Sequence, residues 1–205
     1  MKYKYINTNN INTWTNIQST LDKNKGFSIP RELPAISLQY TADFFNLIHG
    51  KTIVECGTGL QGERSGNSML YWFNKTNANK IFCIDLDEKW IDTVKNKLGN
   101  HKRIVYKHDD CFNVVSDVKN IDLIYMDFNP PNRATAYLNL FDISNSPKMI
   151  LIDDTDHCRP WKQTSIVPRA VKEGYSIIYV GRQTLLIRGD IVEKYAKDIE
   201  YFGHE

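Results

Sequence analysis

Short apolar runs rich in isoleucine and valine recur along the chain from about residue 50 onward. They cover residues 52–56, 80–85, 103–107, 121–126 and 148–152, and the segments between them are long enough for helices. Runs such as KIFCID and KMILID are apolar on both faces, which is typical of strands buried between two helix layers. The pattern therefore predicts an α/β fold built from β-α-β units around a parallel sheet.

The two ends of the chain depart from this rhythm. YSIIYV and QTLLIRG are separated only by Gly181 and Arg182, which is too short for a parallel crossover and suits an antiparallel hairpin. Ahead of the first strand, the pattern predicts a helix over residues 37–48. We therefore expect residues 1–50 to form an N-terminal helical arm, with residues 27–33 as a candidate lid, and residues 51–205 to form the main domain.

Composition narrows the class of protein further. The chain has 205 residues, of which 41% are hydrophobic, and its 26 basic and 24 acidic residues leave a net charge of +2. Such a chain can bury a hydrophobic core. Its small net charge gives no strong electrostatic attraction to nucleic acid or to an anionic membrane. Four cysteines without a CxxC pair and the lack of a long apolar stretch favour a cytoplasmic protein without a membrane segment, and the charge balance predicts no nucleic-acid surface.

Acidic residues close each of the five predicted parallel strands. They are Glu55, Asp85, Asp110, Asp127 and Asp153. Because ligands of open α/β sheets bind beyond the carboxyl ends of the strands, these side chains are expected to line one rim. A carboxylate at a strand end is also a common helix N-cap, so each of them alone has a purely structural interpretation. Five in series favour a ligand site.

A glycine-rich turn follows the first strand. Gly57, Gly59 and Gly62 spell GxGxxG, a pattern that permits a tight turn and close approach of a ligand. For a NAD-dependent oxidoreductase, the acidic residue that binds the ribose should lie about 20 residues onward, and Asp85 lies farther away. Glu55 stands just before the first glycine, where a negative charge favours a cationic ligand over a pyrophosphate.

These motifs, in this order, resemble those of the class I S-adenosylmethionine-dependent methyltransferases. The resemblance covers roughly residues 50–190 and includes the closing hairpin, which a dehydrogenase would not predict. It implies a doubly wound, Rossmann-like, seven-stranded mixed sheet whose C-terminal hairpin is antiparallel. It also implies S-adenosylmethionine as the cofactor.

The resemblance assigns a part of the cofactor to each motif. Glu55 and the turn from Gly57 to Gly59 would hold the methionine end, and Asp85 would accept from both ribose hydroxyls. Asp110 would face the adenine amino group, and the cofactor contacts would also include Cys111 and Asp127. These residue types suit the groups of the cofactor assigned to them. One carboxylate can accept from both hydroxyls of a diol, and an ammonium group favours a nearby acid.

Two features bear on the group that receives the methyl. Asp127, Asp153 and Asp154 resemble the ligands of Mg²⁺ in the metal-dependent catechol-type O-methyltransferases, where the cation lowers the pKa of a bound hydroxyl. The alternative is that this loop only caps the next segment. A base near these residues would be His157 or Asp156, and Asp127 is a further candidate for the catalytic group.

The second feature is the sequence Asn129-Pro130-Pro131, which resembles the NPP[YF] motif of amino-group methyltransferases. Asn132 stands where that motif has an aromatic residue, so a simple turn is the competing interpretation. We expect an enzyme that methylates an oxygen of a small molecule, with or without the help of a metal ion. A homodimer is compatible with this function. An N-methyltransferase that uses the Asn129-Pro130-Pro131 loop, a NAD-dependent oxidoreductase and a non-catalytic subunit that only binds the cofactor stay open as alternatives.

Overall fold

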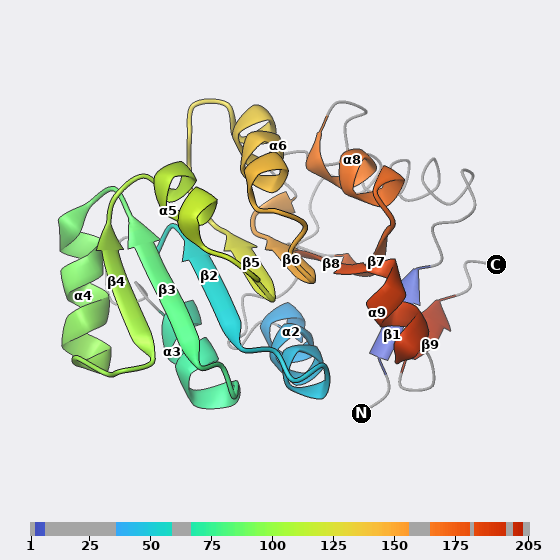
Figure 1. Cartoon of the computed structure of the whole chain (residues 1–205), viewed down its shortest axis with the longest axis horizontal. Helices are drawn as coiled ribbons and strands as arrows, with labels where there is room; N and C mark the ends of the chain where they lie inside the picture. The colour runs from blue at the N-terminus through green and yellow to red at the C-terminus, as the bar shows by residue number, and fades with distance from the viewer. Residues whose placement is uncertain are drawn as a thin grey trace.

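The computed structural model describes residues 3–6, 36–58, 67–155, 165–180, 183–195 and 199–202. Within these residues the strands are β1 (Tyr3–Ile6), β2 (Thr52–Cys56), β3 (Lys80–Asp85), β4 (Ile104–His108), β5 (Leu123–Met126), β6 (Met149–Ile152), β7 (Tyr175–Val180), β8 (Thr184–Arg188) and β9 (Ile199–Phe202). They form one sheet in the order β4-β3-β2-β5-β6-β8-β7-β1-β9. Figure 1 shows this sheet running across the whole molecule.

The predicted mixed sheet of seven strands is confirmed by β2 to β8. The strands β2 to β6 are parallel to one another, β8 runs antiparallel to β6, and β7 runs antiparallel to β8 as the predicted hairpin. The sheet extends two strands beyond the prediction, because β1 pairs with both β7 and β9. This pairing joins segments from opposite ends of the chain, and a local hydrophobic pattern does not encode it.

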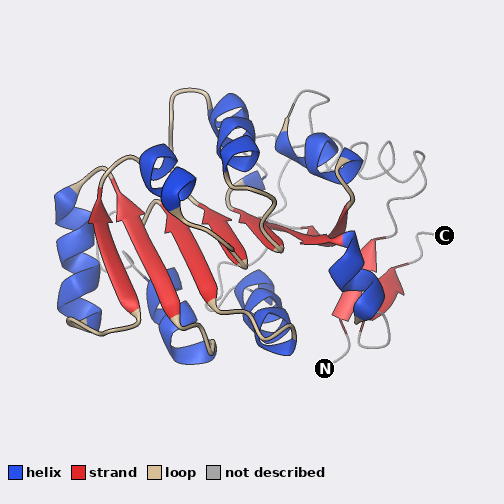
Figure 2. Cartoon of the chain, in the orientation of Figure 1, coloured by secondary structure: helices blue, strands red, loops and turns tan. Residues whose placement is uncertain are grey.

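Helices cover both faces of the sheet (Figure 2). In the described residues they are α2 (Ile36–Leu47), α3 (Asn67–Lys75), α4 (Glu88–Leu98), α5 (Cys111–Asp117), α6 (Arg133–Ile143), α8 (Ile166–Lys172) and α9 (Gly189–Lys194). The fully buried side chains of Phe44 and Trp72 belong to the core under α2 and α3, which also includes residues of α4 and α9. Tyr137 and Phe141 belong to the core on the opposite face, under α5, α6 and α8. The two layers explain why the central strands are apolar on both faces.

Polar residues that follow the strands start the next helices. Asp87 caps α4 by accepting from the backbone N–H of Lys89 at 3.0 Å, and Asn132 caps α6 by accepting from that of Thr135 at 3.3 Å. Asp110 caps α5 in the same way. These caps satisfy helix N–H groups that have no partner inside the helix. The loops that lead from β3 to α4, from β4 to α5 and from β5 to α6 are therefore held by these caps.

The predicted helix over residues 37–48 is present as α2, which packs beside the sheet, and residues 3–6 of the predicted N-terminal arm lie within the sheet. The candidate lid at residues 27–33 lies outside the described residues. In the part of the chain that is described, none of the helices has the length and apolar character needed to cross a membrane.

Candidate active site at the strand ends

Four backbone hydrogen bonds continue the strand ladders just past the carboxyl ends of the parallel strands. They run from the N–H of Gly57 to Ile84, of Asp109 to Asp85, of Asp127 to Cys56, and of Asp153 to Met126, with lengths of 2.9 to 3.1 Å. These hydrogen bonds hold the starts of the loops after β2, β4, β5 and β6 against the ends of neighbouring strands. The acidic residues of these loops consequently lie at one edge of the sheet, which is the edge where the sequence pattern predicts a ligand site.

The turn after β2 has no room for a side chain. Gly57 has a φ of +86°, in the left-handed region, and a Cβ placed there would lie 2.3 Å from the carbonyl oxygen of Asp127. Only glycine combines this conformation with such close packing of two backbones. Gly59 and Gly62, the other glycines of the pattern, lie outside the described residues.

Asp85 ties this turn to the end of β3. Its Oδ2 accepts from the backbone N–H of Thr58 at 2.8 Å, and its Oδ1 accepts from that of Asp87 at 2.9 Å. The side chain is half-buried at the rim. The Thr58 hydroxyl also donates to Oδ2 at 3.4 Å, so these bonds fix the orientation of the carboxylate at the end of β3.

Asp110 has the capping role that its position allows. Its Oδ1 accepts from the backbone N–H of Phe112 at 2.9 Å, and Cys111 is the buried first residue of α5. The preceding Asp109 accepts from the N–H of Asp110 at 2.7 Å, which further orders the turn. The structure therefore places Asp110 and Cys111 at the same edge as Asp85, and their contact with an adenine stays a prediction.

Glu55 lies behind the rim and not on it. Its side chain is fully buried under α3, where it accepts from the hydroxyl of Ser68 and the indole N–H of Trp72, each at 2.7 Å. Burial raises the pKa of Glu55 from 4.5 to about 8, against the lowering effect of these two hydrogen bonds. Each carboxyl oxygen of Glu55 thus has a donor from α3, and its contact with a cofactor ammonium group stays a prediction.

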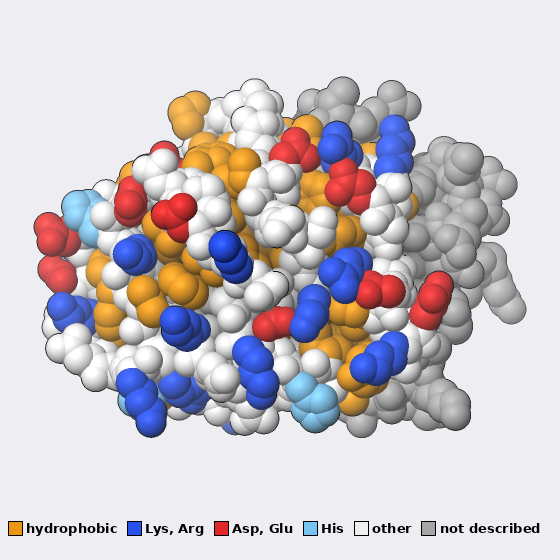
Figure 3. All heavy atoms as spheres, in the orientation of Figure 1, with side chains coloured by type: hydrophobic (Ala, Val, Ile, Leu, Met, Phe, Trp, Pro, Cys, Tyr) orange, Lys and Arg blue, Asp and Glu red, His pale blue; other side chains and the backbone are white. Residues whose placement is uncertain are grey.

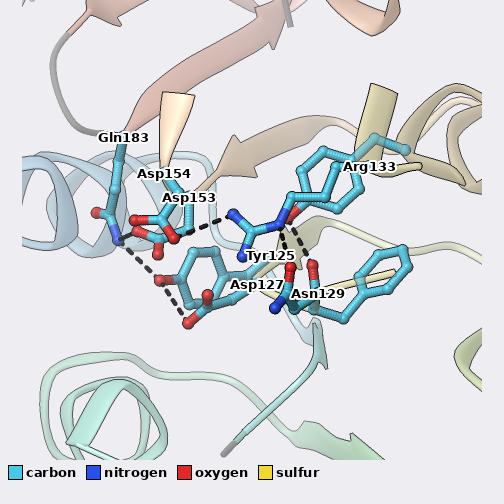
Figure 4. Close-up of polar contacts among 9 residues, drawn as sticks. Tyr125, Asp127, Asn129, Arg133, Asp153, Asp154 and Gln183 are labelled. Carbon is cyan, nitrogen blue, oxygen red and sulfur yellow. Dashed lines mark hydrogen bonds and ion pairs between the residues drawn. The ribbon is translucent and has the colours of Figure 1, made fainter. Parts of the chain in front are cut away.

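A network of buried polar side chains lies between the ends of β5, β6 and β8 (Figure 4). The amide of Gln183 donates to the hydroxyl of Tyr125 at 2.7 Å and to Asp153 at 2.6 Å, and the Tyr125 hydroxyl donates to Asp127 at 3.3 Å. The carbonyl oxygen of Gln183 accepts from the hydroxyl of Ser37. Gln183 thus connects α2 to two of the predicted site aspartates.

Two carboxyl groups meet in this network. Burial raises the pKa of Asp127 well above its ordinary range, and the neighbouring Asp153 raises it further. Burial, followed by the charge of Asp127, likewise raises the pKa of the Tyr125 hydroxyl. Both effects favour the protonated form of the Asp127 carboxyl more than water would.

Asp154 faces outward from the network and binds Arg133. The guanidinium Nη1 of Arg133 lies 3.0 Å from Oδ2 of Asp154, and its Nε donates to Oδ1 of Asn129 at 2.9 Å. Asp154 has a φ of +49°, a conformation that residues other than glycine rarely adopt. Arg133 thus joins the loop after β5 to the loop after β6, and it engages the amide oxygen that an NPP-type site would offer to an amine.

The prediction that Asp127, Asp153 and Asp154 form a metal site is not supported. Among the described residues, no three histidine, cysteine, aspartate or glutamate side chains are arranged to hold a metal ion. The physical reason is that each of the three aspartates accepts from a protein donor: Tyr125, Gln183 and Arg133, respectively. His157 and Asp156, the predicted bases, lie outside the described residues.

Sequence reasoning missed the donors of this site. Tyr125 stands two residues before Asp127, which places both on one face of the chain, and that period was available in the sequence. Arg133 follows Asn129 by four residues. Gln183 is a polar residue at the start of an otherwise apolar strand, which is the signal that could have identified it.

A separate groove of about 530 Å³ lies along the face of β3 and β4 beside α5. Phe82 and Val118 contribute apolar surface to it, and Lys80, Lys107 and Lys119 contribute ammonium groups. Figure 3 shows hydrophobic surface flanked by basic side chains over this part of the molecule. The groove shares Asp109 with the turn before α5 but none of the buried carboxylates of the network.

Comparison with solved structures identifies the known fold that this chain shares. No protein-family model and no curated protein matches the chain. Among solved structures, a provisionally named O-methyltransferase from Klebsiella pneumoniae matches with a TM-score of 0.58 at 16% identity, over 85% of this chain and 89% of that one. An O-methyltransferase from Bacillus cereus in complex with S-adenosylhomocysteine gives 0.55 at 13% identity, over 88% and 93%.

A third match is a methyltransferase from Podospora anserina, also bound to S-adenosylhomocysteine, with a TM-score of 0.52 at 18% identity. It covers 87% of this chain and 96% of that one. At these identities the likeness concerns the fold. The chain therefore has the class I methyltransferase fold, as the resemblance of its sequence motifs implies.

Proposed function

We propose that this protein is an S-adenosylmethionine-dependent methyltransferase that methylates an oxygen of a small molecule. The observation that carries the proposal is the edge formed by Gly57, Asp85 and Asp110, at the ends of adjacent strands of a class I methyltransferase fold. Solved neighbours of the same fold include an O-methyltransferase in complex with S-adenosylhomocysteine.

The residues at this edge fit such a cofactor. The backbone of the Gly57 turn packs directly against the backbone of Asp127, which brings the turn after β2 and the loop after β5 together at this edge. Asp85 offers carboxylate oxygens to ribose hydroxyls, and Asp110 offers one to an amino group. When bound, the cofactor would supply a methyl group on a positively charged sulfur, and the surrounding carboxylates favour that charge.

The chain's own part in catalysis would be to orient the acceptor and to remove its proton. Holding an oxygen nucleophile in line with the sulfur–methyl bond supplies much of the rate by proximity. Asp127 lies at this rim, and His157 and Asp156 follow Asp153 closely in the sequence, so these three are our candidates for the group that takes the proton.

Cofactor binding tests the first half of the proposal. Calorimetry should detect binding of S-adenosylhomocysteine and none of NAD. Asp85→Ala should abolish this binding and leave the thermal unfolding cooperative, whereas Asp92→Ala, on the exposed face of α4, should bind as wild type does. Unchanged affinity in Asp85→Ala would remove Asp85 from the ribose role.

Turnover tests the second half. Small hydroxylated compounds and matched amines, supplied with methyl-labelled S-adenosylmethionine, should give label in the hydroxylated compounds. Transfer only to amines would support the N-methyltransferase alternative. Cofactor binding without transfer to any acceptor would support a non-catalytic, cofactor-binding subunit.

A further inference from the structure

The three aspartates predicted as metal ligands each accept from another side chain of the protein (Figure 4). The contacts, donor first, are Tyr125–Asp127 at 3.3 Å, Gln183–Asp153 at 2.6 Å and Arg133–Asp154 at 3.0 Å. Of these three donors, the Arg133 guanidinium carries a positive charge. The carboxylate cluster is thus met by a cation that the chain itself provides.

Two contacts fix the position of this cation. Arg133 is the first residue of α6. Its Nη1 binds Asp154 in the loop after β6, and its Nε binds Asn129 in the loop after β5. The side chains of Arg133 and Asp154 are only 20% and 18% exposed, so water screens the pair less than it would on an open surface. A planar guanidinium held by two acceptors in this way has a defined orientation.

The backbone of Asp154 supports the same arrangement. Its φ of +49° is uncommon for a residue with a side chain, and such conformations persist where the surroundings hold them. The ion pair with Arg133 is one such constraint. The carboxylate of Asp154 thus binds the first residue of α6, whereas Asp127 and Asp153 accept from Tyr125 and Gln183.

We propose that Arg133 supplies the positive charge that balances this carboxylate cluster, and that it does so in place of a divalent cation. A hard cation needs several oxygen ligands that converge on it, and Asp154 converges on Arg133 instead. A cation bound beside the guanidinium would also be repelled by it. This inference rests on the charge balance of the cluster and goes beyond methyl transfer.

Mn²⁺ alone, followed by electron paramagnetic resonance on the full chain, tests the proposal. Wild-type protein is expected to leave the spectrum of free Mn²⁺ unchanged. Arg133→Gln removes the charge and the ion pair with Asp154, so this variant should bind Mn²⁺ and lower the signal of the free ion that wild type leaves unchanged. Arg133→Lys keeps the charge and should behave as wild type, and adding Asp154→Asn to Arg133→Gln should abolish the gain.

Two results would overturn the proposal. One is a stoichiometric Mn²⁺ site in the wild type that Asp153→Asn removes, which would make the cluster a metal centre. The other is a folded Arg133→Gln variant, verified by thermal unfolding, that gains no Mn²⁺ affinity. If that variant does not fold, the wild-type titration decides alone. Binding of S-adenosylhomocysteine, measured separately, reports on the methyltransferase proposal whatever the Mn²⁺ result.

Discussion

The carboxylate of Glu55 accepts from the indole N–H of Trp72 at 2.7 Å, and neither side chain is exposed to solvent. The pair fastens the first turns of α3 to the central strand β2, directly behind the glycine turn. Because burial raises the pKa of Glu55 to about 8, the folded protein holds a proton there that the unfolded chain releases above about 4.5. The stability of the fold is therefore linked to pH through this residue.

We predict that Glu55→Gln removes this pH dependence. A raised carboxyl pKa gives stability that is complete below the unfolded pKa and is lost as the pH rises toward the folded value of about 8. The loss is at most about 1.4 kcal/mol per pH unit. Glutamine can still accept from Trp72 and donate to the Ser68 hydroxyl, so the variant should become relatively more stable than wild type as the pH rises.

Urea unfolding of both proteins between about pH 5 and pH 8 measures this difference. The exposed Glu193→Gln is the matched control, since it removes a carboxylate from α9 without removing a buried one. Parallel pH profiles for wild type and Glu55→Gln would show that Glu55 is ionised in the folded state.

We predict that Gly57→Ala costs more stability and more cofactor affinity than Gly174→Ala. Both glycines have positive φ, +86° and +89°, so both substitutions carry a left-handed backbone penalty of about 1–2 kcal/mol. At Gly57 the new Cβ also meets the Asp127 carbonyl, whereas nothing lies within 4 Å at Gly174. Denaturant unfolding and calorimetry with S-adenosylhomocysteine measure the two effects. Equal losses in the two variants would mean that the loop after β5 yields easily.

Asp110 allows its two roles to be separated. Asp110→Ser keeps an N-cap of similar strength, so stability should change by less than about 0.5 kcal/mol, while Asp110→Ala should lose about 1 kcal/mol. Serine is too short to offer an oxygen to an adenine amino group, so both variants should bind S-adenosylhomocysteine more weakly. Wild-type affinity in the serine variant would assign Asp110 to capping alone.

Gln183→Leu should destabilise the protein by about 2–3 kcal/mol, because it leaves Asp153, Tyr125 and Ser37 without their amide partner in a buried site. Gln183→Glu keeps the shape but adds a carboxyl beside Asp153, so its cost should rise with pH. Thermal unfolding at two pH values distinguishes them. A leucine variant as stable as wild type would indicate that water replaces the amide.

The parts of the fold that follow from local patterns were predictable from the sequence. Strands such as β3 are apolar on both faces, which identifies a sheet between two helix layers, and the short link between β7 and β8 determines their antiparallel pairing. Asp85 and Asp110 reach the same edge because each ends a parallel strand or begins the helix after it. These positions follow from connectivity alone.

Partners that come from distant segments were not predictable in this way. Gln183 meets Asp153 only after the hairpin folds back along β6, and Arg133 meets Asp154 only when α6 docks. The charges of Asp127, Asp153 and Asp154 indicate a metal site when read in isolation, and the donors packed against them change that reading. The burial of Glu55 under α3 was also not predictable, because a carboxylate at a strand end can point into either helix layer.

The position of β1 makes the order of assembly unusual. In the described part of the chain β9 has β1 as its strand neighbour, and β1 in turn rests on β7. β9 therefore depends for this pairing on a strand from almost the other end of the sequence, with Tyr3 aligned with Ile199. Closing the long loop between β1 and β9 is a slow folding step. We therefore expect this edge of the sheet to be the first part of the fold to unfold.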